Sequence, residues 1–220
     1  MAKQKKLTKS NIVEAYMAYI GENGKRPKTI FHLMKVLGYP EQEFYTHFVN
    51  FDILDRHIMA EFCNHTLSLI KKNKAFVDYS AKEQLLSFYF TFFELLTANR
   101  SYVNFIFENR SMVQLPPVFR DLRFAFKSFI REIEHPSLDF MKNSKLMKAG
   151  NWTLDEAAWV QFLFTIKYYL NDTSPSFEKT DLLIEKSINA GFEVLDIKQF
   201  DKVIDFGKFI IKETLGSRVN

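Results

Sequence analysis

The 220-residue sequence is poor in the residues that break helices and form tight turns. It holds 7 glycines and 6 prolines, and no glycine occurs between Tyr39 and Ala149. The hairpin-forming dipeptides Asn-Gly and Asp-Gly occur only once, at Asn23-Gly24, at the end of a helical pattern. This scarcity excludes a chain built from β-hairpins and predicts an all-α fold.

Cysteine and long apolar runs are also scarce. The single cysteine, Cys63, has no partner for an intramolecular disulfide, and the N-terminal residues MAKQKKLTKSN lack the apolar stretch of a signal peptide. The most apolar run, Leu85–Phe93, is far shorter than the roughly 20 residues that span a membrane. We therefore expect a reducing, cytoplasmic setting and no membrane partner.

Signatures of catalysis and cofactor binding are missing as well. The sequence has no Gly-x-Ser-x-Gly, P-loop, Gly-x-Gly-x-x-Gly or His-Glu-x-x-His pattern. His57, Cys63 and His65 come nearest to a metal cluster, but the two histidines point about 80° apart on a helix and lack the i, i+4 spacing of paired ligands. We expect no enzymatic activity, no cofactor and no metal.

Two features are present in excess, and they lie in different parts of the chain. Of the 24 phenylalanines, 5 fall in residues 1–72 and 19 in the remainder. Residues 1–54 carry 8 basic and 5 acidic residues, a balance of 8 − 5 = +3, out of a total formal charge of +4. The first part therefore suits a polyanionic partner, and the second part is rich in buried rings.

Helical periodicity and capping residues organise the N-terminal part. The spacing predicts one helix over Lys9–Asn23, with Thr8 as its N-cap and Gly24 as its stop, and a second from Thr29 to Gly38. Pro40 is expected to open a third helix that carries Phe44, Tyr45 and Phe48. Two short helices joined by a glycine-containing turn are typical of a helix-turn-helix.

The rest of the chain also shows helical patterns separated by proline, glycine and asparagine. We expect helices at 52–72, 81–98, 102–109, 117–134, 153–171, 177–195 and 197–215.

Within the N-terminal part, eight residues follow a known pattern in order and without a gap: Thr29, Gly38, Tyr39, Tyr45, His47, Phe48, Asp52 and Leu54. Here the sequence resembles the DNA-binding domain of the tetracycline-repressor (TetR-like) family over about residues 8–54. The resemblance implies a helix-turn-helix domain at 1–54 and a larger helical ligand-binding and dimerisation domain at 55–220. It further implies a homodimeric transcriptional regulator, of the repressor kind, whose binding to a double-stranded DNA operator is modulated by an apolar small molecule.

The resemblance assigns DNA contacts to basic and polar side chains of this domain. Hydroxyl and ring N–H donors can bind phosphates, Gln42 can pair with adenine, and Thr46 can reach a base edge. The basic N-terminal arm either enters a minor groove or is a solvated tail. The expected DNA-binding residues are Lys5, Lys28, Thr29, Gln42, Tyr45, Thr46 and His47.

Some residues depart from the family pattern on the DNA side. Pro40 and Gln42-Glu43 replace a Ser/Thr cap and a small Gly-Thr pair, and Phe51 replaces a basic residue. Glu41 and Glu43 favour the helix dipole and can accept from cytosine N4, but they repel nearby phosphates. The alternative is therefore a repressor-fold protein that has lost DNA binding and serves as an apolar-ligand, lipid-binding or protein-interaction module.

Aromatic and aliphatic residues of the second part are candidates for a pocket and a dimer interface. Ring-rich core packing is the alternative for the first set, and packing within one subunit is the alternative for the second. The expected pocket residues are Phe88, Phe92, Phe105, Phe126, Trp159, Phe162 and Tyr169. The expected dimer residues are Leu183, Phe192, Phe206, Phe209 and Ile210.

Overall fold

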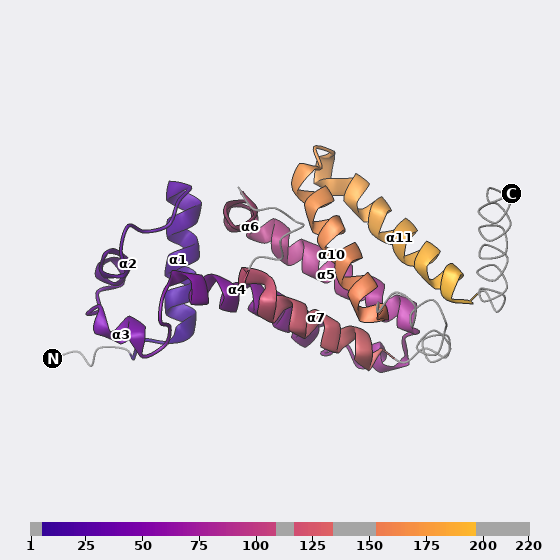
Figure 1. The fold of residues 1–220 in the computed structure, drawn as a ribbon, viewed down its shortest axis with the longest axis horizontal. Coiled ribbons are helices and arrows are strands. Elements are labelled where there is room, and N and C mark those ends of the chain that lie inside the picture. Colours follow the sequence, from indigo (N-terminus) through magenta and orange to yellow (C-terminus); the bar gives the residue numbers. More distant parts are fainter. Residues whose placement is uncertain (1–5, 109–116, 134–152, 197–220) are drawn as a thin grey trace, which may run out of the picture. The chain divides into compact units, whose positions relative to one another are not determined.

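The computed structural model describes residues 6–108, 117–133 and 153–196 (Figure 1). All regular secondary structure in these ranges is helical, which confirms the predicted all-α fold. The α-helices are α1 (Lys9–Asn23), α2 (Ile30–Leu37), α3 (Gln42–Tyr45), α4 (Phe51–Ile70), α5 (Ala81–Ala98), α6 (Arg100–Phe107), α7 (Arg120–Glu132), α10 (Leu154–Asn171) and α11 (Glu178–Asp196). Short 3₁₀ helices lie at η1 (Lys74–Asp78), η2 (Pro117–Phe119) and η3 (Pro175–Phe177). Among the described helices, none combines the length and the apolar character needed to cross a membrane.

The ends of the first two helices agree with the predicted caps. The Thr8 hydroxyl oxygen accepts from the Asn11 backbone N–H, and the Asn11 side chain accepts in return from the Thr8 N–H, each at 3.2 Å. Gly24 and Gly38 end α1 and α2 in the left-handed conformation, with φ of 64° and 76°. Glycine adopts this conformation without the Cβ clash that other residues meet, so both stops follow from the sequence.

The third helix is shorter than predicted. It spans only Gln42–Tyr45, so Pro40 precedes it and Phe48 follows it. The chain is tight on both sides of this helix. Bonds to carbonyls three residues back rather than four are formed by the backbone N–H groups of Glu43, Phe44, Thr46 and His47. The Thr46 hydroxyl also donates to the Glu43 carbonyl at 2.7 Å, which competes with helix continuation.

Several later boundaries also differ from the prediction. Helix α6 begins at Arg100 rather than Tyr102, and residues 117–119 form a 3₁₀ turn before α7. Phe177 has φ of 60°, outside the helical region, so α11 begins at Glu178. The predicted ends at Asn109 and Glu134 and the predicted helix 197–215 lie outside the described residues.

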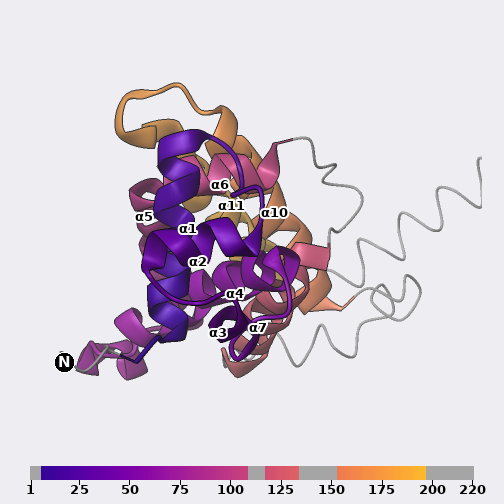
Figure 2. The same cartoon turned by 90° about the vertical axis from the view of Figure 1, so that its left-hand side faces the viewer.

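The described residues divide into two compact units. The first unit comprises those within 1–73 and 90–126, and the second comprises those within 74–89 and 127–220. In the first unit α1 contacts both α2 and α6, and α4 packs against η2. Figures 1 and 2 show α1, α2 and α3 gathered in one cluster. In the second unit α10 and α11 pack together as an antiparallel pair (Figure 1).

The connection between α10 and α11 is built around one carboxylate. One oxygen of Asp172 accepts from the Ser174 backbone N–H and hydroxyl at 2.8 and 2.6 Å. Its other oxygen accepts from the Thr180 backbone N–H and hydroxyl at 2.9 and 2.7 Å. Burial of Asp172 opposes ionisation, but these four bonds outweigh it and lower the pKa of this carboxyl. The ionised side chain therefore holds the first turn of α11 against the end of α10.

Replacing this carboxylate is expected to weaken the fold. We expect Asp172→Ala to lower the free energy of unfolding by about 2 kcal/mol, since hydrogen bonds to charged groups contribute roughly 1.5–3 kcal/mol. Urea unfolding followed by circular dichroism measures this. Thr173→Ala, a change at the exposed neighbouring position, serves as the control and should shift stability by less than about 0.5 kcal/mol. Equal effects of the two changes would contradict the assignment.

The effect of Asp172 should also depend on pH. The pKa of Asp172 is lowered in the folded state, so its stabilisation is present above the unfolded value of about 3.9 and is lost as pH falls through the folded value. The difference between the wild type and Asp172→Ala should therefore shrink below about pH 4.

Candidate nucleic-acid interface

Helices α2 and α3 and the turn between them form the helix-turn-helix. The Gly38 N–H donates to the Lys35 carbonyl at 3.2 Å, and the Tyr39 N–H donates to the Met34 carbonyl at 3.0 Å, which closes the turn. Leu33, Met34, Phe44 and Phe48 are buried under it. Both helices are therefore fixed by their inner faces, and their outer faces carry polar residues together with the exposed Phe31, Val36 and Tyr45.

Most of the predicted DNA-binding residues are exposed to solvent. Lys28, Thr29, Gln42, Tyr45 and Thr46 are exposed, and His47 is half-buried. Lys5 lies outside the described residues. Solvent exposure is what these side chains share, both at the start of α2 and along α3.

Several of these polar groups already have local partners. The Thr29 hydroxyl oxygen caps α2 by accepting from the His32 N–H at 3.1 Å. The Tyr45 hydroxyl donates to a Glu41 carboxylate oxygen at 2.9 Å, and this bond is the main reason that the pKa of Tyr45 is raised. Tyr45 is nonetheless 53% exposed, so its ring remains on the surface.

Part of the basic charge around the helix-turn-helix is engaged by other side chains. The Arg26 guanidinium, just before α2, forms an ion pair with Asp52 at 2.7 Å and a second one with Asp55. Lys9 lies over the Phe48 ring, 5.8 Å from its centroid. Lys25 and Lys28, shortly before α2 in the sequence, and Lys35 within it are exposed.

A buried carboxylate joins the helix-turn-helix to α6. Asp55 on α4 has no solvent exposure; it pairs with Arg26 and accepts from the Tyr102 hydroxyl at 2.9 Å. The Arg26 guanidinium also lies over the Phe105 ring of α6, 5.9 Å from its centroid. Three parts of the chain therefore meet at this group: the segment that connects α1 to α2, the start of α4, and the start of α6. We call the group the Asp55 cluster; it consists of Arg26, Asp55, Tyr102 and Phe105.

The electrostatics of the Asp55 cluster keep each partner in one protonation state. Burial and the neighbouring Asp55 carboxylate raise the pKa of Tyr102, so its hydroxyl remains a donor. Burial alone would lower the pKa of Arg26, but its bond and charge interaction with Asp55 raise the pKa overall. Tyr16 completes the surroundings, with its ring 5.1 Å from Phe51 and 6.3 Å from Tyr102.

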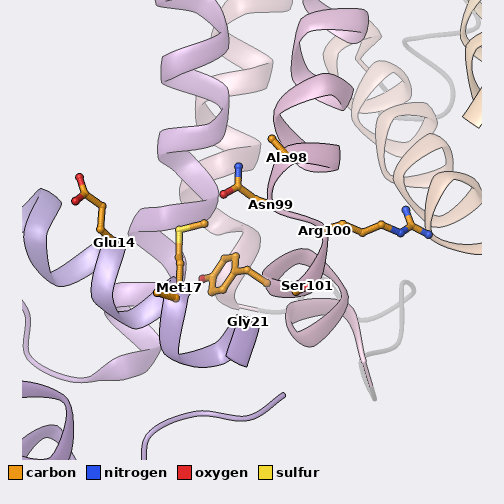
Figure 3. A pocket seen from close by; sticks show the side chains of 9 residues that line it. Glu14, Met17, Gly21, Ala98, Asn99, Arg100 and Ser101 are labelled. Carbon is orange, nitrogen blue, oxygen red and sulfur yellow. The ribbon is translucent and has the colours of Figure 1, made fainter. Parts of the chain in front are cut away.

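A surface cleft of about 400 Å³ lies beside this cluster, between α1 and the junction of α5 and α6. In Figure 3 Met17 and Asn99 lie between the two walls, and Glu14 and Arg100 extend away from each other at opposite sides. The lining residues are Glu14, Met17, Ala18, Gly21, Ala98, Asn99, Arg100, Ser101 and Tyr102. The predicted pocket residues are not among them.

The predicted pocket residues are mostly buried and in ring contact. Phe88, Phe92, Phe126, Trp159, Phe162 and Tyr169 are at most 1% exposed, and Phe105 is half-buried. In the second unit the Phe162 ring lies 5.9 Å from both Phe88 and Trp159, and Phe88 stacks on Phe129 at 4.9 Å. Phe105 instead packs against Arg26 and Tyr102.

A polar network crosses this aromatic interior of the second unit. The Tyr89 hydroxyl donates to the Gln161 side-chain oxygen, and the Gln161 amide donates to Thr165 at 3.0 Å and to Ser187 at 2.9 Å. The network ties α5 to α10 and α11. Tyr89 and Thr165 are buried, and Gln161 and Ser187 are half-buried, and a few such polar groups beside rings are the kind of anchor that an apolar site uses.

The residues predicted for dimerisation are only partly within the described chain. Leu183 and Phe192 on α11 are half-buried, and Phe206, Phe209 and Ile210 lie outside the described residues. Sequence reasoning did not single out the outer face of α10, where Val160, Phe164 and Tyr168 are 49%, 57% and 37% exposed. Their i, i+4, i+8 spacing places them on one helical face, but an apolar stripe of this kind also fits a buried face.

The Asp55 cluster was also missed, although one signal for it was present. Asp55 lies three residues before Ile58 and seven before Phe62, so an acidic residue occupies the apolar face of the predicted linker helix. The partners Arg26 and Tyr102 are distant in sequence, and no local pattern names them.

The histidines and the cysteine that come nearest to a metal-binding pattern in the sequence are His57, Cys63 and His65. Within the described ranges, no three His, Cys, Asp or Glu side chains lie together as ligands would. Cys63 is buried, and burial raises the pKa of its thiol to about 12, so it stays protonated and unreactive. Burial also lowers the pKa of His57, which is half-buried.

These features define an all-α protein with an N-terminal helix-turn-helix and a larger helical remainder. A family model described as "Tetracyclin repressor-like, C-terminal domain" matches residues 84–210, more than half of the chain. The chain therefore belongs to the tetracycline repressor-like family, which confirms the resemblance found in its N-terminal part. A comparison with curated proteins gives no match.

Removing the buried charge of the Asp55 cluster is expected to destabilise the protein. We expect Asp55→Asn to lower the free energy of unfolding by about 2–3 kcal/mol, because breaking a buried pair costs roughly 3–5 kcal/mol and Arg26 is partly exposed. Urea unfolding measures the loss.

Asp52→Asn is the matched control for this change. It makes the same substitution opposite the same arginine, but the Asp52 side chain is 76% exposed, so the expected cost is below about 1 kcal/mol. If Asp52→Asn destabilised the protein as much as Asp55→Asn, the central role given to Asp55 would be wrong.

Proposed function

We propose that this protein is a DNA-binding transcriptional regulator of the repressor kind, which binds a double-stranded operator in the cytoplasm as a homodimer. We further propose that an apolar small molecule modulates this binding and that no catalysis is involved. The observation that carries the proposal is the helix-turn-helix, which exposes Lys28, Gln42 and Thr46, in a chain of the tetracycline repressor-like family. Residues 1–54 form the DNA-binding part in this proposal, and residues 55–220 form the ligand-binding and dimerisation part.

The proposed DNA contacts follow from exposure and chemistry. Lys5, Lys28 and Thr29 reach phosphates, and so does His47 through a ring N–H. Gln42 opens α3 and is exposed, which suits a contact to a base edge, and Thr46 is exposed one turn later. The N-terminal residues of a recognition helix are the ones that reach base edges in a helix-turn-helix.

The proposed effector site lies in the aromatic interior of the second unit. Rings supply most of the surface that an apolar ligand needs, and the Tyr89–Gln161–Thr165–Ser187 network supplies polar anchors. An effector seated among these side chains would be surrounded mainly by rings, with the Gln161 amide as a polar partner.

The proposed route from the second part of the chain to DNA passes through α6. Tyr102 and Phe105 of α6 contact Asp55 and Arg26, which hold the start of α4 and the entry to α2. A shift of α6 therefore acts directly on the base of the helix-turn-helix, which supports regulation by a ligand bound elsewhere.

The proposed homodimer uses the outer faces of α10 and α11. Val160, Phe164 and Tyr168 form an exposed apolar stripe on α10, and Leu182 on α11 is 49% exposed. Contiguous exposed apolar surface marks an association site more often than isolated residues do. A two-fold dimer pairs the same stripe from each subunit and presents two recognition helices to two half-sites.

Specific, salt-dependent DNA binding is the central test. Fluorescence anisotropy with duplexes from the region upstream of its own gene should reveal a complex whose affinity falls steeply with salt concentration. Lys28→Gln should weaken binding to all duplexes alike and reduce the salt slope by about one for each phosphate that Lys28 no longer neutralises. Lys179→Gln, at an exposed position on α11, is the control and should leave the slope unchanged.

Absence of any salt-dependent specific complex would overturn this proposal. It would favour the second candidate, a repressor-fold module for apolar ligands, lipids or proteins. The observation that favours that candidate is the pair of glutamates, Glu41 and Glu43, on the face expected to meet DNA.

The dimer face makes a separate prediction. Phe164→Glu should convert the dimer to a monomer, measured by sedimentation equilibrium, because it buries a charge against its symmetry mate. Specific DNA affinity should fall with it, since both half-sites are then read independently. Phe124→Glu, at a 72% exposed position on α7, is the matched control and should stay dimeric. An unchanged mass for Phe164→Glu would remove α10 from the interface.

A further inference from the structure

The Glu41 carboxylate, directly before α3, is hydrogen-bonded to a side chain of α3. Glu41 stands directly before α3 in helical conformation, and Tyr45 lies one turn later. The Tyr45 hydroxyl donates to one Glu41 carboxylate oxygen at 2.9 Å. Residues four apart lie on the same helical face, so Glu41 shares its face with the exposed Tyr45 ring, next to the exposed Gln42.

This hydrogen bond restricts what Glu41 and Tyr45 can do. The tyrosine proton is directed at the carboxylate, so in this conformation Tyr45 does not offer it to a phosphate. Glu41 is half-buried, and an ionised carboxylate can only accept hydrogen bonds. One oxygen is held by Tyr45, and the second oxygen still has its full capacity to accept a hydrogen bond from a ligand.

The base edges of the major groove differ in what they offer such an acceptor. Guanine presents two acceptors, thymine presents an acceptor and a methyl group, and adenine presents a donor beside the N7 acceptor. Cytosine alone presents its amino donor without an acceptor on the same base. A rigid carboxylate is therefore attracted by cytosine and repelled, wholly or in part, by the other three bases.

We propose that Glu41 is a specificity-determining residue that reads a cytosine in each operator half-site, with Tyr45 as the positioning residue that aims its carboxylate. This inference rests on the proposed function and names the base that the interface selects. It accounts for an acidic side chain on a DNA-facing surface, because the charge is directed at a base edge rather than at the phosphates. The raised pKa of Tyr45 supports it, since the hydroxyl stays protonated and continues to donate.

The experiment compares the full-length protein with three variants by selection from random duplexes, followed by anisotropy with single-base operator variants. Glu41→Gln should lower affinity for the cytosine-containing operator by about tenfold and shift the preference at that one position toward adenine, with which glutamine pairs. Tyr45→Phe keeps the ring and should reduce discrimination at the same position by a few fold. Glu43→Gln makes the same charge change two residues away and should leave every base preference unaltered.

The possible results separate this inference from the proposed function. If the wild type forms a specific complex but Glu41→Gln keeps the same preference at every position, Glu41 does not read a base and the inference is overturned. The same holds if Glu41→Gln strengthens binding to all duplexes equally, since Glu41 then acts only through phosphate repulsion. If the wild type shows no specific complex at all, the proposed function fails and this inference fails with it. Circular dichroism of each variant confirms that the fold is retained.

Discussion

Asp55 carries a negative charge with no solvent exposure, and its partners come from separate stretches of the chain. Arg26 reaches it from the connection before α2, and Tyr102 reaches it from α6. An ionised group in such a place is tolerated only when charge and hydrogen bonds compensate for lost water. The positions of α2, α4 and α6 are consequently set together, and a helix-turn-helix that is small by itself becomes part of a larger unit.

Ion pairs and hydrogen bonds engage several charged side chains around the helix-turn-helix. Arg26 is engaged by Asp52 and Asp55, and the Glu41 carboxylate is engaged by Tyr45. The other exposed side chains around α2 and α3 are a few lysines, neutral polar groups and apolar residues such as Phe31 and Val36. Under the proposed function, such a surface would gain less from phosphate neutralisation than a strongly basic one, so contacts to bases would carry a larger share of its selectivity.

Many of the phenylalanines that follow residue 72 pack against one another in the interior. In the second unit, rings from α5, α7 and α10 contact one another closely, and a network of hydroxyls and one amide runs through them. Close-packed interiors have low compressibility and transmit strain, so a change at one ring acts on its neighbours. Phe105 has a different role, because its ring supports the Arg26 guanidinium.

Local chemistry was sufficient to predict the all-α fold, the caps of α1 and α2, and the helix-turn-helix. Thr8, Gly24, Thr29 and Gly38 act through hydrogen bonds and backbone conformations only a few residues long, so the sequence by itself determined them. The short length of α3 also results from hydrogen bonds between residues that are close in sequence, although the prediction did not include its bonds between residues i and i−3.

The tertiary structure alone decided which distant residues meet. Asp55 is separated from Arg26 by 29 positions and from Tyr102 by 47, and no periodicity links them, because ion pairing depends on how helices pack rather than on spacing along one helix. The same holds for the face of α10: the sequence shows that Val160, Phe164 and Tyr168 share a side, but only packing against α11 reveals that this side stays exposed. Whether an apolar stripe is buried or exposed depends on how the helices pack together, and the sequence of one helix does not determine that packing.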